Sequence, residues 1–140
     1  MTTVEITLTT AVRDLLLAHL PAAVPSGTPV RAEADKAALA MPCFTVAAEG
    51  TEYLHPRLVR TTLTVRLETR ADATSAADAA AWHQATCDEL AARILTLSGT
   101  LAAAGFQLRR FMPAALSDAE TAGEERRRTV SQSWSLHLCQ

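Results

Sequence analysis

The sequence predicts one α+β domain spanning residues 1–140, in which an antiparallel β-sheet carries an N-terminal helix and a long central helix on one face. The chain of 140 residues suits a single domain, and its 49% hydrophobic residues are enough for a packed core. Residues 57–70 alternate apolar and polar side chains, which indicates a long strand with one buried face. Residues 74–97 repeat apolar side chains every three or four positions, which indicates the long helix.

The first third of the chain predicts a helix followed by short elements. Residues 9–20 follow helical spacing, and Thr9 or Thr10 can cap the N-terminus. Pro21 ends this helix, because the residue before a proline avoids the α region. After it we expect, in order, a turn-rich connection (21–29), a short strand (29–34), a helical turn or a loop (35–41), a strand (43–49) and a polar loop (50–56).

The middle of the chain gives the strongest signals. The helix at 74–97 begins after Thr74 or Ser75 as its cap, and residues 98–105 predict one further helical turn. The buried face of the strand at 57–70 is expected to consist of Val59, Thr61, Leu63, Val65 and Leu67. The helical stripe that faces the sheet is expected to contain Ala76, Ala80, His83, Cys87, Leu90, Ile94 and Leu97.

The last third predicts two strands separated by a loop. Residues 106–112 indicate a strand, and residues 113–125 indicate a polar loop of a length that is usually either functional or disordered. Residues 126–140 indicate the closing strand. Its buried face is expected to contain Val130, Gln132, Trp134, Leu136 and Leu138.

Composition and charge exclude several classes of protein. Lys plus Arg is 13 and Asp plus Glu is 15, giving a formal net charge of -2, so a globally basic nucleic-acid binder is excluded. No apolar run approaches the length of a membrane helix, and the first ten residues lack the pattern of a secretory signal. Three cysteines without a paired motif argue against a disulfide framework and for a reducing compartment during folding.

The motifs of enzymes and metal proteins are absent from the sequence. His83 and Cys87 lie four residues apart on one helix and could supply two zinc ligands, but no second pair exists, so ordinary packing is favoured. Cys43 is expected to be a buried small apolar residue rather than a nucleophile. We therefore expect no enzyme activity, no cofactor and no metal.

Charged side chains are the candidates for contacts with other proteins. Arg126, Arg127 and Arg128, with Arg109 and Arg110 before them, form the only basic concentration in the sequence. They fit two interpretations: they cover the edge of a sheet and prevent self-pairing, or they contact an acidic partner, for which a neighbouring subunit is favoured over DNA. The full set of candidate contact residues is Glu52, Tyr53, Arg60, Arg66, Glu68, Arg126, Arg127 and Arg128.

The order of these elements resembles the tail terminator proteins of long-tailed bacteriophages, also called tail-completion or minor tail proteins. The matching features are an N-terminal amphipathic helix ending in LLAHLP, a proline-led strand PCFTVAAE and a long strand RLVRTTLTVRLETR. An alanine-rich helix, ADATSAADAAAWHQATCDELAARIL, follows at once, and a late strand, RRRTVSQSWSLHLCQ, closes the domain. The resemblance is one of layout and covers nearly the whole chain.

This resemblance implies a structural role in the virion and no catalytic residues. Family members form a ring, usually a hexamer, on the head-proximal end of the tail tube. The ring stops tube polymerisation and presents the surface that joins the tail to the head. The implied partners are further copies of the chain, the tail-tube protein and a head-completion or connector protein. DNA passes through the lumen without specific binding, and assembly takes place in the host cytoplasm.

The resemblance also implies that ring or tube contacts lie in the segment Gly50–Pro56, in the loop at 113–125 and on the face that carries Arg60 and Arg66. Two alternatives remain open at this point. The first alternative is that the chain is another phage connector, such as a head-closure or tail-tube protein. Alternatively, it is a small α+β enzyme or ligand-binding domain with His83, Cys87 and Cys43 at a pocket.

Overall fold

The computed structural model describes residues 2–33, 41–121 and 126–140. The helical turn or loop expected over residues 35–41 lies outside the described residues except for Met41. The last part of the loop expected over 113–125 also lies outside them.

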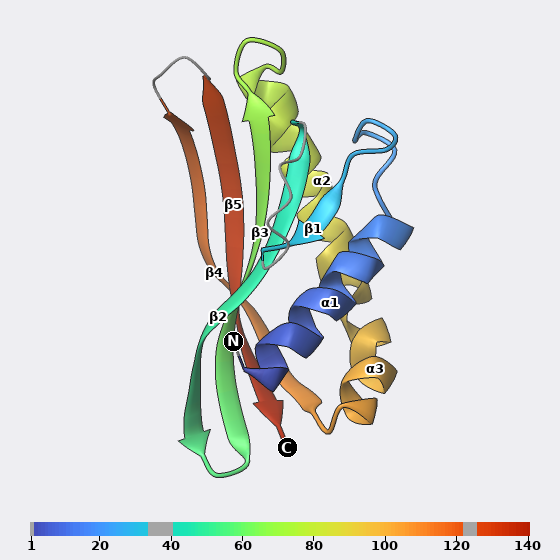
Figure 1. The fold of residues 1–140 in the computed structure, drawn as a ribbon, viewed down its shortest axis with the longest axis vertical. Helices are drawn as coiled ribbons and strands as arrows, with labels where there is room; N and C mark the ends of the chain where they lie inside the picture. The colour runs from blue at the N-terminus through green and yellow to red at the C-terminus, as the bar shows by residue number, and fades with distance from the viewer. Residues whose placement is uncertain (1, 34–40, 122–125) are drawn as a thin grey trace.

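Five strands of the described chain form one sheet in the order β1-β2-β3-β5-β4 (Figure 1). Neighbouring strands are antiparallel except for β1, which runs parallel to β2, so the expected antiparallel sheet is in fact mixed at one edge. The four other strands are long, and the whole sheet is strongly twisted (Figure 1). The strands are β1 (Val30–Ala32), β2 (Cys43–His55), β3 (Leu58–Arg70), β4 (Gln107–Thr121) and β5 (Arg127–Cys139).

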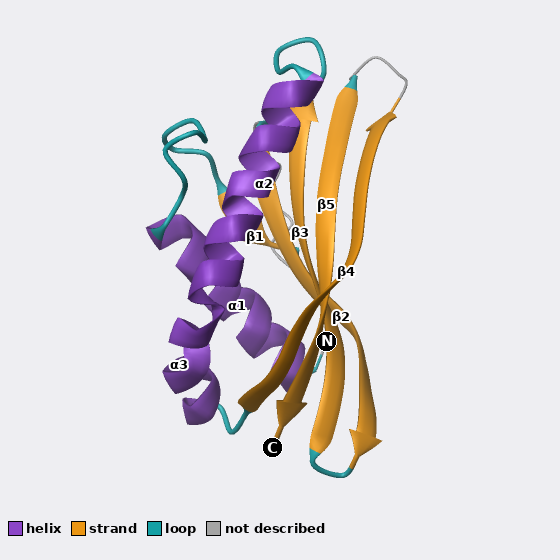
Figure 2. Cartoon of the chain, turned by 180° about the vertical axis from the view of Figure 1, so that it is seen from behind, coloured by secondary structure: helices purple, strands orange, loops and turns teal. Residues whose placement is uncertain are grey.

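The helices lie together on one face of the sheet (Figure 2). They are α1 (Thr3–Ala18), α2 (Ala76–Arg93), the 3-10 turn η1 (Ile94–Leu97) and α3 (Ser98–Ala103). The predicted α+β fold, with an N-terminal helix and a long central helix on one sheet face, is therefore confirmed. The further helical turn expected after the long helix is also present, as α3.

The core lies between this helix layer and the inner face of the sheet. On β3 the expected alternation is confirmed, because the five residues predicted to be buried are all at 0% exposure. On β5, Trp134 is 3% exposed and stacks on Phe111 of β4, with ring centroids 5.4 Å apart. The largest fully buried side chains that the helices add to this core are Leu8, Leu16 and Val12 from α1, Leu90 and His83 from α2, and Leu101 from α3.

Helix α1 begins at Thr3, whereas the sequence predicted a start after Thr9 or Thr10 as the cap. Thr2 is the actual cap: its hydroxyl accepts the N–H of Glu5, and the Glu5 carboxylate accepts the N–H of Thr2 at 2.7 Å. This reciprocal pair is a capping box. It extends the helix over a segment rich in β-branched residues, and the resulting extra turns bury Val4 and Leu8.

Helix α2 is capped by Ser75, one of the two expected residues, whose hydroxyl accepts the N–H of Asp78 at 3.1 Å. The buried stripe includes Ala79, whereas Ala76 and Ala80 are exposed, so the first part of the predicted stripe was wrong. A helix that buries His83 also buries the position four residues before it, which is Ala79.

Strand β2 continues through the segment expected to be a loop over 50–56. Gly50 adopts φ of 66°, and the register shifts between Glu49 and Glu52, which marks a β-bulge. The glycine that was read as the end of the strand therefore bends it without ending it. The turn of the β2–β3 hairpin is confined to Pro56 and Arg57.

Strand β4 likewise continues through most of the loop expected over 113–125, as far as Thr121. Its register shifts between Leu108 and Arg110 and again between Pro113 and Ala115. Residues 112–121 are all exposed, because β4 is the outermost strand and pairs only with β5. A strand that is exposed on both faces lacks the apolar alternation by which strands are recognised.

The outer face of the sheet carries small hydroxyl-bearing side chains along its middle and is not covered by any described helix (Figure 2). Cross-strand register places Thr62 and Thr64 of β3 beside Ser135 and Ser133 of β5, and all four are half-buried. Longer charged side chains flank this region on both sides along the strands.

Candidate functional site

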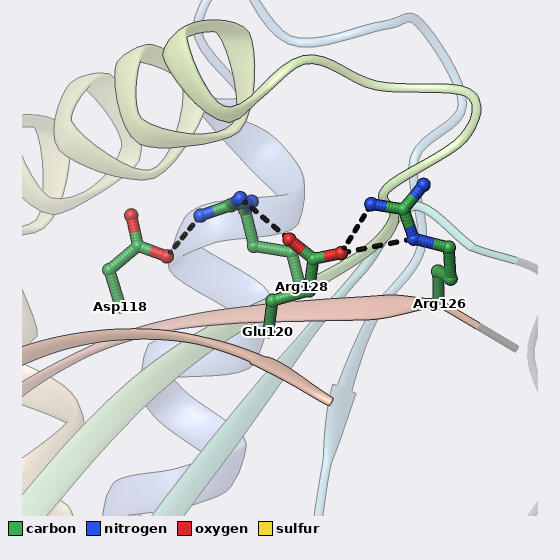
Figure 3. A network of polar contacts seen from close by, with 4 residues as sticks. All are labelled: Asp118, Glu120, Arg126 and Arg128. Carbon is green, nitrogen blue, oxygen red and sulfur yellow. Dashed lines mark hydrogen bonds and ion pairs between the residues drawn. The ribbon is translucent and has the colours of Figure 1, made fainter. Parts of the chain in front are cut away.

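The arginine run at the start of β5 is held by acids of the same chain (Figure 3). Arg128 donates to the Asp118 carboxylate at 2.9 Å and to Glu120 at 3.2 Å. Arg126 donates to Glu120 from two nitrogens, at 2.8 and 3.2 Å. The four residues form one chain of ion pairs that joins the far end of β4 to the start of β5.

The outer-face charges of β3 are also matched within the chain. Arg60 pairs with Glu52 on β2, Arg66 lies 3.3 Å from the Glu33 carboxylate, and Glu68 lies 3.4 Å from Arg127. Each of these pairs is at least partly exposed, so each adds little to stability on its own. Their role as contacts with a neighbouring copy stays a prediction.

The first interpretation, that these arginines cover a sheet edge, is wrong for Arg127 and Arg128. Arg127 and Arg128 belong to β5, which lies between β3 and β4 inside the sheet. The basic residues on the edge strand are Arg109 and Arg110 at the start of β4. Both are exposed, and no ion pair is found for either of them among the described residues.

The His83–Cys87 pair is buried against the sheet. The His83 Nε2 atom lies 3.0 Å from the Val65 carbonyl, and because that oxygen can only accept, Nε2 carries the proton. The Cys87 sulfur lies 3.6 Å from the same nitrogen. Burial lowers the pKa of His83 below its usual 6.5 and raises the pKa of Cys87 to about 12. These shifts disfavour both the imidazolium and the thiolate.

Cys43 is kept apart from this pair by the sheet itself. Its register partner is Glu68 on the outer face, whereas His83 bonds to β3 from the helix side. Burial is also the main cause that raises the Cys43 pKa. His83, Cys87 and Cys43 therefore do not share one pocket, which removes the basis of the alternative that placed an enzyme or ligand site there.

No group of three or more His, Cys, Asp or Glu side chains able to hold a metal ion is found in residues 2–33, 41–121 and 126–140. Within those same ranges, none of the helices combines the length and the apolar character that a membrane span needs.

The structure shows two further surface features at one end of the molecule. The first is an open groove of about 460 Å³ between α3 and the start of β4, lined by residues that include Ala102, Phe106 and Leu108. The second is the end of the β2–β3 hairpin, where Tyr53 is 61% exposed and Leu54 is 43% exposed. Tyr53 is a candidate contact residue from the sequence, and Leu54 lies in the segment Gly50–Pro56 for which the resemblance implied contacts, whereas the groove was not anticipated.

The groove and the hairpin lie at the same end of the molecule but at opposite edges of the sheet (Figures 1 and 2). The groove could not be anticipated, because it is formed by the packing of α3 against two strand ends. The available signal for the hairpin was Tyr53 itself, a large aromatic residue in a polar segment.

No protein-family model matches this chain, and no curated protein sequence matches it.

Proposed function

We propose that this chain is a structural subunit of a bacteriophage virion that assembles into a ring and caps the head-proximal end of the tail tube. The ring ends tube polymerisation and offers the surface to which a head-completion or connector protein binds. DNA passes through its lumen without specific contacts. The subunit is not an enzyme and uses no cofactor, and its assembly takes place in the host cytoplasm.

One observation carries the proposal. The described chain forms a sheet with four strands of 13 to 15 residues. Helices cover one face of this sheet, and its other face and the β4 edge are uncovered. Together with the order of elements, this layout resembles the tail terminator family.

The exposed surfaces of the two sheet edges differ from one another, which favours a ring. A closed ring is built from heterologous contacts, in which one patch binds a different patch on the next copy. Here the edge that contains the end of β2 presents Tyr53 and Leu54, and the edge that contains β4 presents Arg109 and Arg110. A protein with two such unlike edges can close a ring without a second type of subunit.

The test is an assembly experiment with tail tubes grown from the tail-tube protein of the same phage. Tubes are imaged with and without this protein, and the mass of the free protein is measured. The expected result is a multi-copy ring on one end of each tube and no further elongation from that end. A protein that stays monomeric and never associates with tubes or heads would refute the proposal. Binding only along the tube wall, or incorporation into the tube, would favour a different connector role.

A further inference from the structure

We propose that the end of the β2–β3 hairpin of one copy inserts into the groove between α3 and β4 of the next copy, with Tyr53 and Leu54 as the anchoring side chains. The proposal rests on the ring-forming function given above, and it names the residues on both sides of the contact. It commits to a second copy of this chain as the occupant of the groove.

The inserting element is an exposed hairpin end. Tyr53 and Leu54 belong to the last three residues of β2, just before the turn at Pro56 and Arg57. The hairpin extends past the N-terminal end of α1, so no helix covers it (Figure 1). The register shift between Tyr53 and His55 sets Leu54 outside the regular pairing with β3. Large exposed side chains on a projecting element, tyrosine above all, are typical anchors of interfaces.

The receiving element is the groove beside α3. Its volume of about 460 Å³ falls in the range of cavities that bind ligand-sized groups. Phe106 and Leu108 line it from the start of β4, and Ala102 lines it from α3. Gly105, with φ of 88°, makes the tight connection between the two elements and adds no side chain to the groove. The remaining lining residues include the polar Ser98, Gln107 and Gln140, so the open groove offers apolar surface to Leu54 and the ring of Tyr53 and hydrogen-bonding groups to the Tyr53 hydroxyl.

The sheet topology allows the contact to close into a ring. Because β2, β3, β5 and β4 follow one another in antiparallel pairs, β2 and β4 run in opposite directions at the two sides of the sheet. A rotation about an axis along the strands brings β2 of one copy beside β4 of the next, still antiparallel. The hairpin end and the groove lie at the same end of the molecule, so such a rotation also brings them to the same height (Figure 2).

Exposed charges lie on both sides of the contact. On the hairpin, Glu52 pairs with Arg60 of the same chain, whereas Glu49 and Arg57 are exposed and no ion pair is found for them among the described residues. On the β4 side, Arg109 and Arg110 are exposed, and the described residues supply no ion pair for them. Glu49 is therefore the hairpin acid that is available to Arg109 or Arg110 of the next copy, and opposite charges at the rim of an interface fix its register.

The main test uses engineered cysteines. Leu54→Cys and Ala102→Cys are combined in a Cys139→Ser background, because Cys139 is the half-buried native thiol and Cys43 and Cys87 are buried. Two strands lie between β2 and β4, which sets β2 and β4 about 14 Å apart, and Ala102 lies on α3, which packs against β4, so the two new thiols of one chain are not expected to bond to each other. Mild oxidation with diamide is expected to give a covalent ladder that ends at the size of the ring.

The matched control replaces Ala102→Cys with Ala77→Cys, an exposed position at the start of α2 near the other end of the sheet (Figure 1). This pair is expected to give no ladder. A ladder of equal yield from the control pair, or rings that give no Leu54–Ala102 cross-link, would overturn the inference and leave the proposed function standing.

Two further variants probe the contact without cross-linking. Tyr53→Ser is expected to weaken self-association at least tenfold with unchanged thermal stability, because the side chain is exposed in the monomer. Ala102→Trp, which fills the groove from an exposed position, is expected to do the same. Leu95→Ser is the control, since Leu95 is 73% exposed but belongs to neither surface, and it should leave association unchanged.

The outcomes separate the two proposals. Rings that form with unchanged affinity in Tyr53→Ser and Ala102→Trp overturn the inference alone. Cross-linked rings that fail to cap tail tubes refute the proposed function and leave the contact established. A protein that stays monomeric at all concentrations, with and without tubes, overturns both.

Discussion

Arg128 and Arg126 share an acceptor, and the structure predicts that their removal has very different consequences. Arg128 bridges Asp118 and Glu120 with its side chain only 18% exposed, whereas Arg126 contacts Glu120 alone and is 60% exposed. Hydrogen bonds to charged groups contribute about 1.5–3 kcal/mol when well shielded, and exposed ion pairs contribute about 0.2–1 kcal/mol. The two carboxylates are 41% and 32% exposed, so the contribution of Arg128 lies between these limits.

We therefore expect Arg128→Met to lower the free energy of unfolding by about 1–2 kcal/mol, and Arg126→Met to lower it by about 0.5 kcal/mol or less. Methionine keeps most of the apolar stem, so the comparison isolates the guanidinium. The buried Nε of Arg128 has no hydrogen-bond partner within the described chain. This unpaired donor lowers the net contribution of Arg128, so the expected loss in free energy of unfolding is less than that of two full hydrogen bonds.

The measurement is equilibrium urea unfolding of the two variants and the wild type, at low salt and in 0.5 M NaCl. Salt should reduce the effect of Arg126→Met more than that of Arg128→Met, because the exposed pair is more strongly screened. Equal destabilisation by the two substitutions would refute the reasoning. So would a loss of ring assembly in Arg126→Met without a change in stability, since that would show a contact between copies.

Three further outcomes follow from the core and the bulge. Burial lowers the pKa of His83 below 6.5, so its contribution to the free energy of unfolding should be complete above pH 6.5 and decrease as the pH falls below that value. Urea unfolding measured over a pH series checks this. The free energy of unfolding should decrease less with falling pH in His83→Gln, which does not titrate and keeps a donor for the Val65 carbonyl. Of the three thiols only Cys139 should react quickly with Ellman's reagent before unfolding, and a second fast thiol would contradict the burial of Cys43 and Cys87. Gly50→Ala should cost about 1–2 kcal/mol and Gly50→Asn less in thermal unfolding, because φ is positive and no atom lies within 4 Å of an added Cβ.

The sequence predicts the interior of this fold better than its edges. The alternation in β3 and in β5 follows directly from burial on one face, which is why both strands were placed within one residue of their observed ends. Helix α1 was begun too late because Thr3, Val4 and Ile6 favour strands, although the Thr2–Glu5 capping box was present as a signal. Local propensity is overridden there by the packing of Val4 and Leu8.

The parts that bear on contacts were predicted least well, for a physical reason. An edge strand is exposed on both faces, so β4 beyond Met112 carries polar residues and a proline and reads as a loop. The outer half of β2 was missed at Gly50, whose left-handed backbone permits a bulge within the strand. A strand segment that is exposed on both faces has no apolar alternation from which it can be predicted.

The distribution of unpaired charge separates structural arginines from those available to a partner. At the end of the sheet where β4 ends and β5 begins, Arg126 and Arg128 form ion pairs with Glu120 and Asp118. The N–H of Ala71, just after β3, also donates to the Arg126 carbonyl at 2.7 Å. At the opposite end of the sheet, no ion pair with an acid of the described chain is found for Arg109 or Arg110. Exposed apolar side chains, among them Tyr53 and Leu54, lie at the same end. An exposed arginine without an ion pair costs the folded chain little free energy, because water solvates its charge. The net charge of -2 does not show this uneven distribution, because it gives only the sum of the positive and negative side chains and not their positions. The densest arginine run is therefore paired within the chain, whereas Arg57, Arg109 and Arg110 are exposed arginines for which no ion pair is found among the described residues.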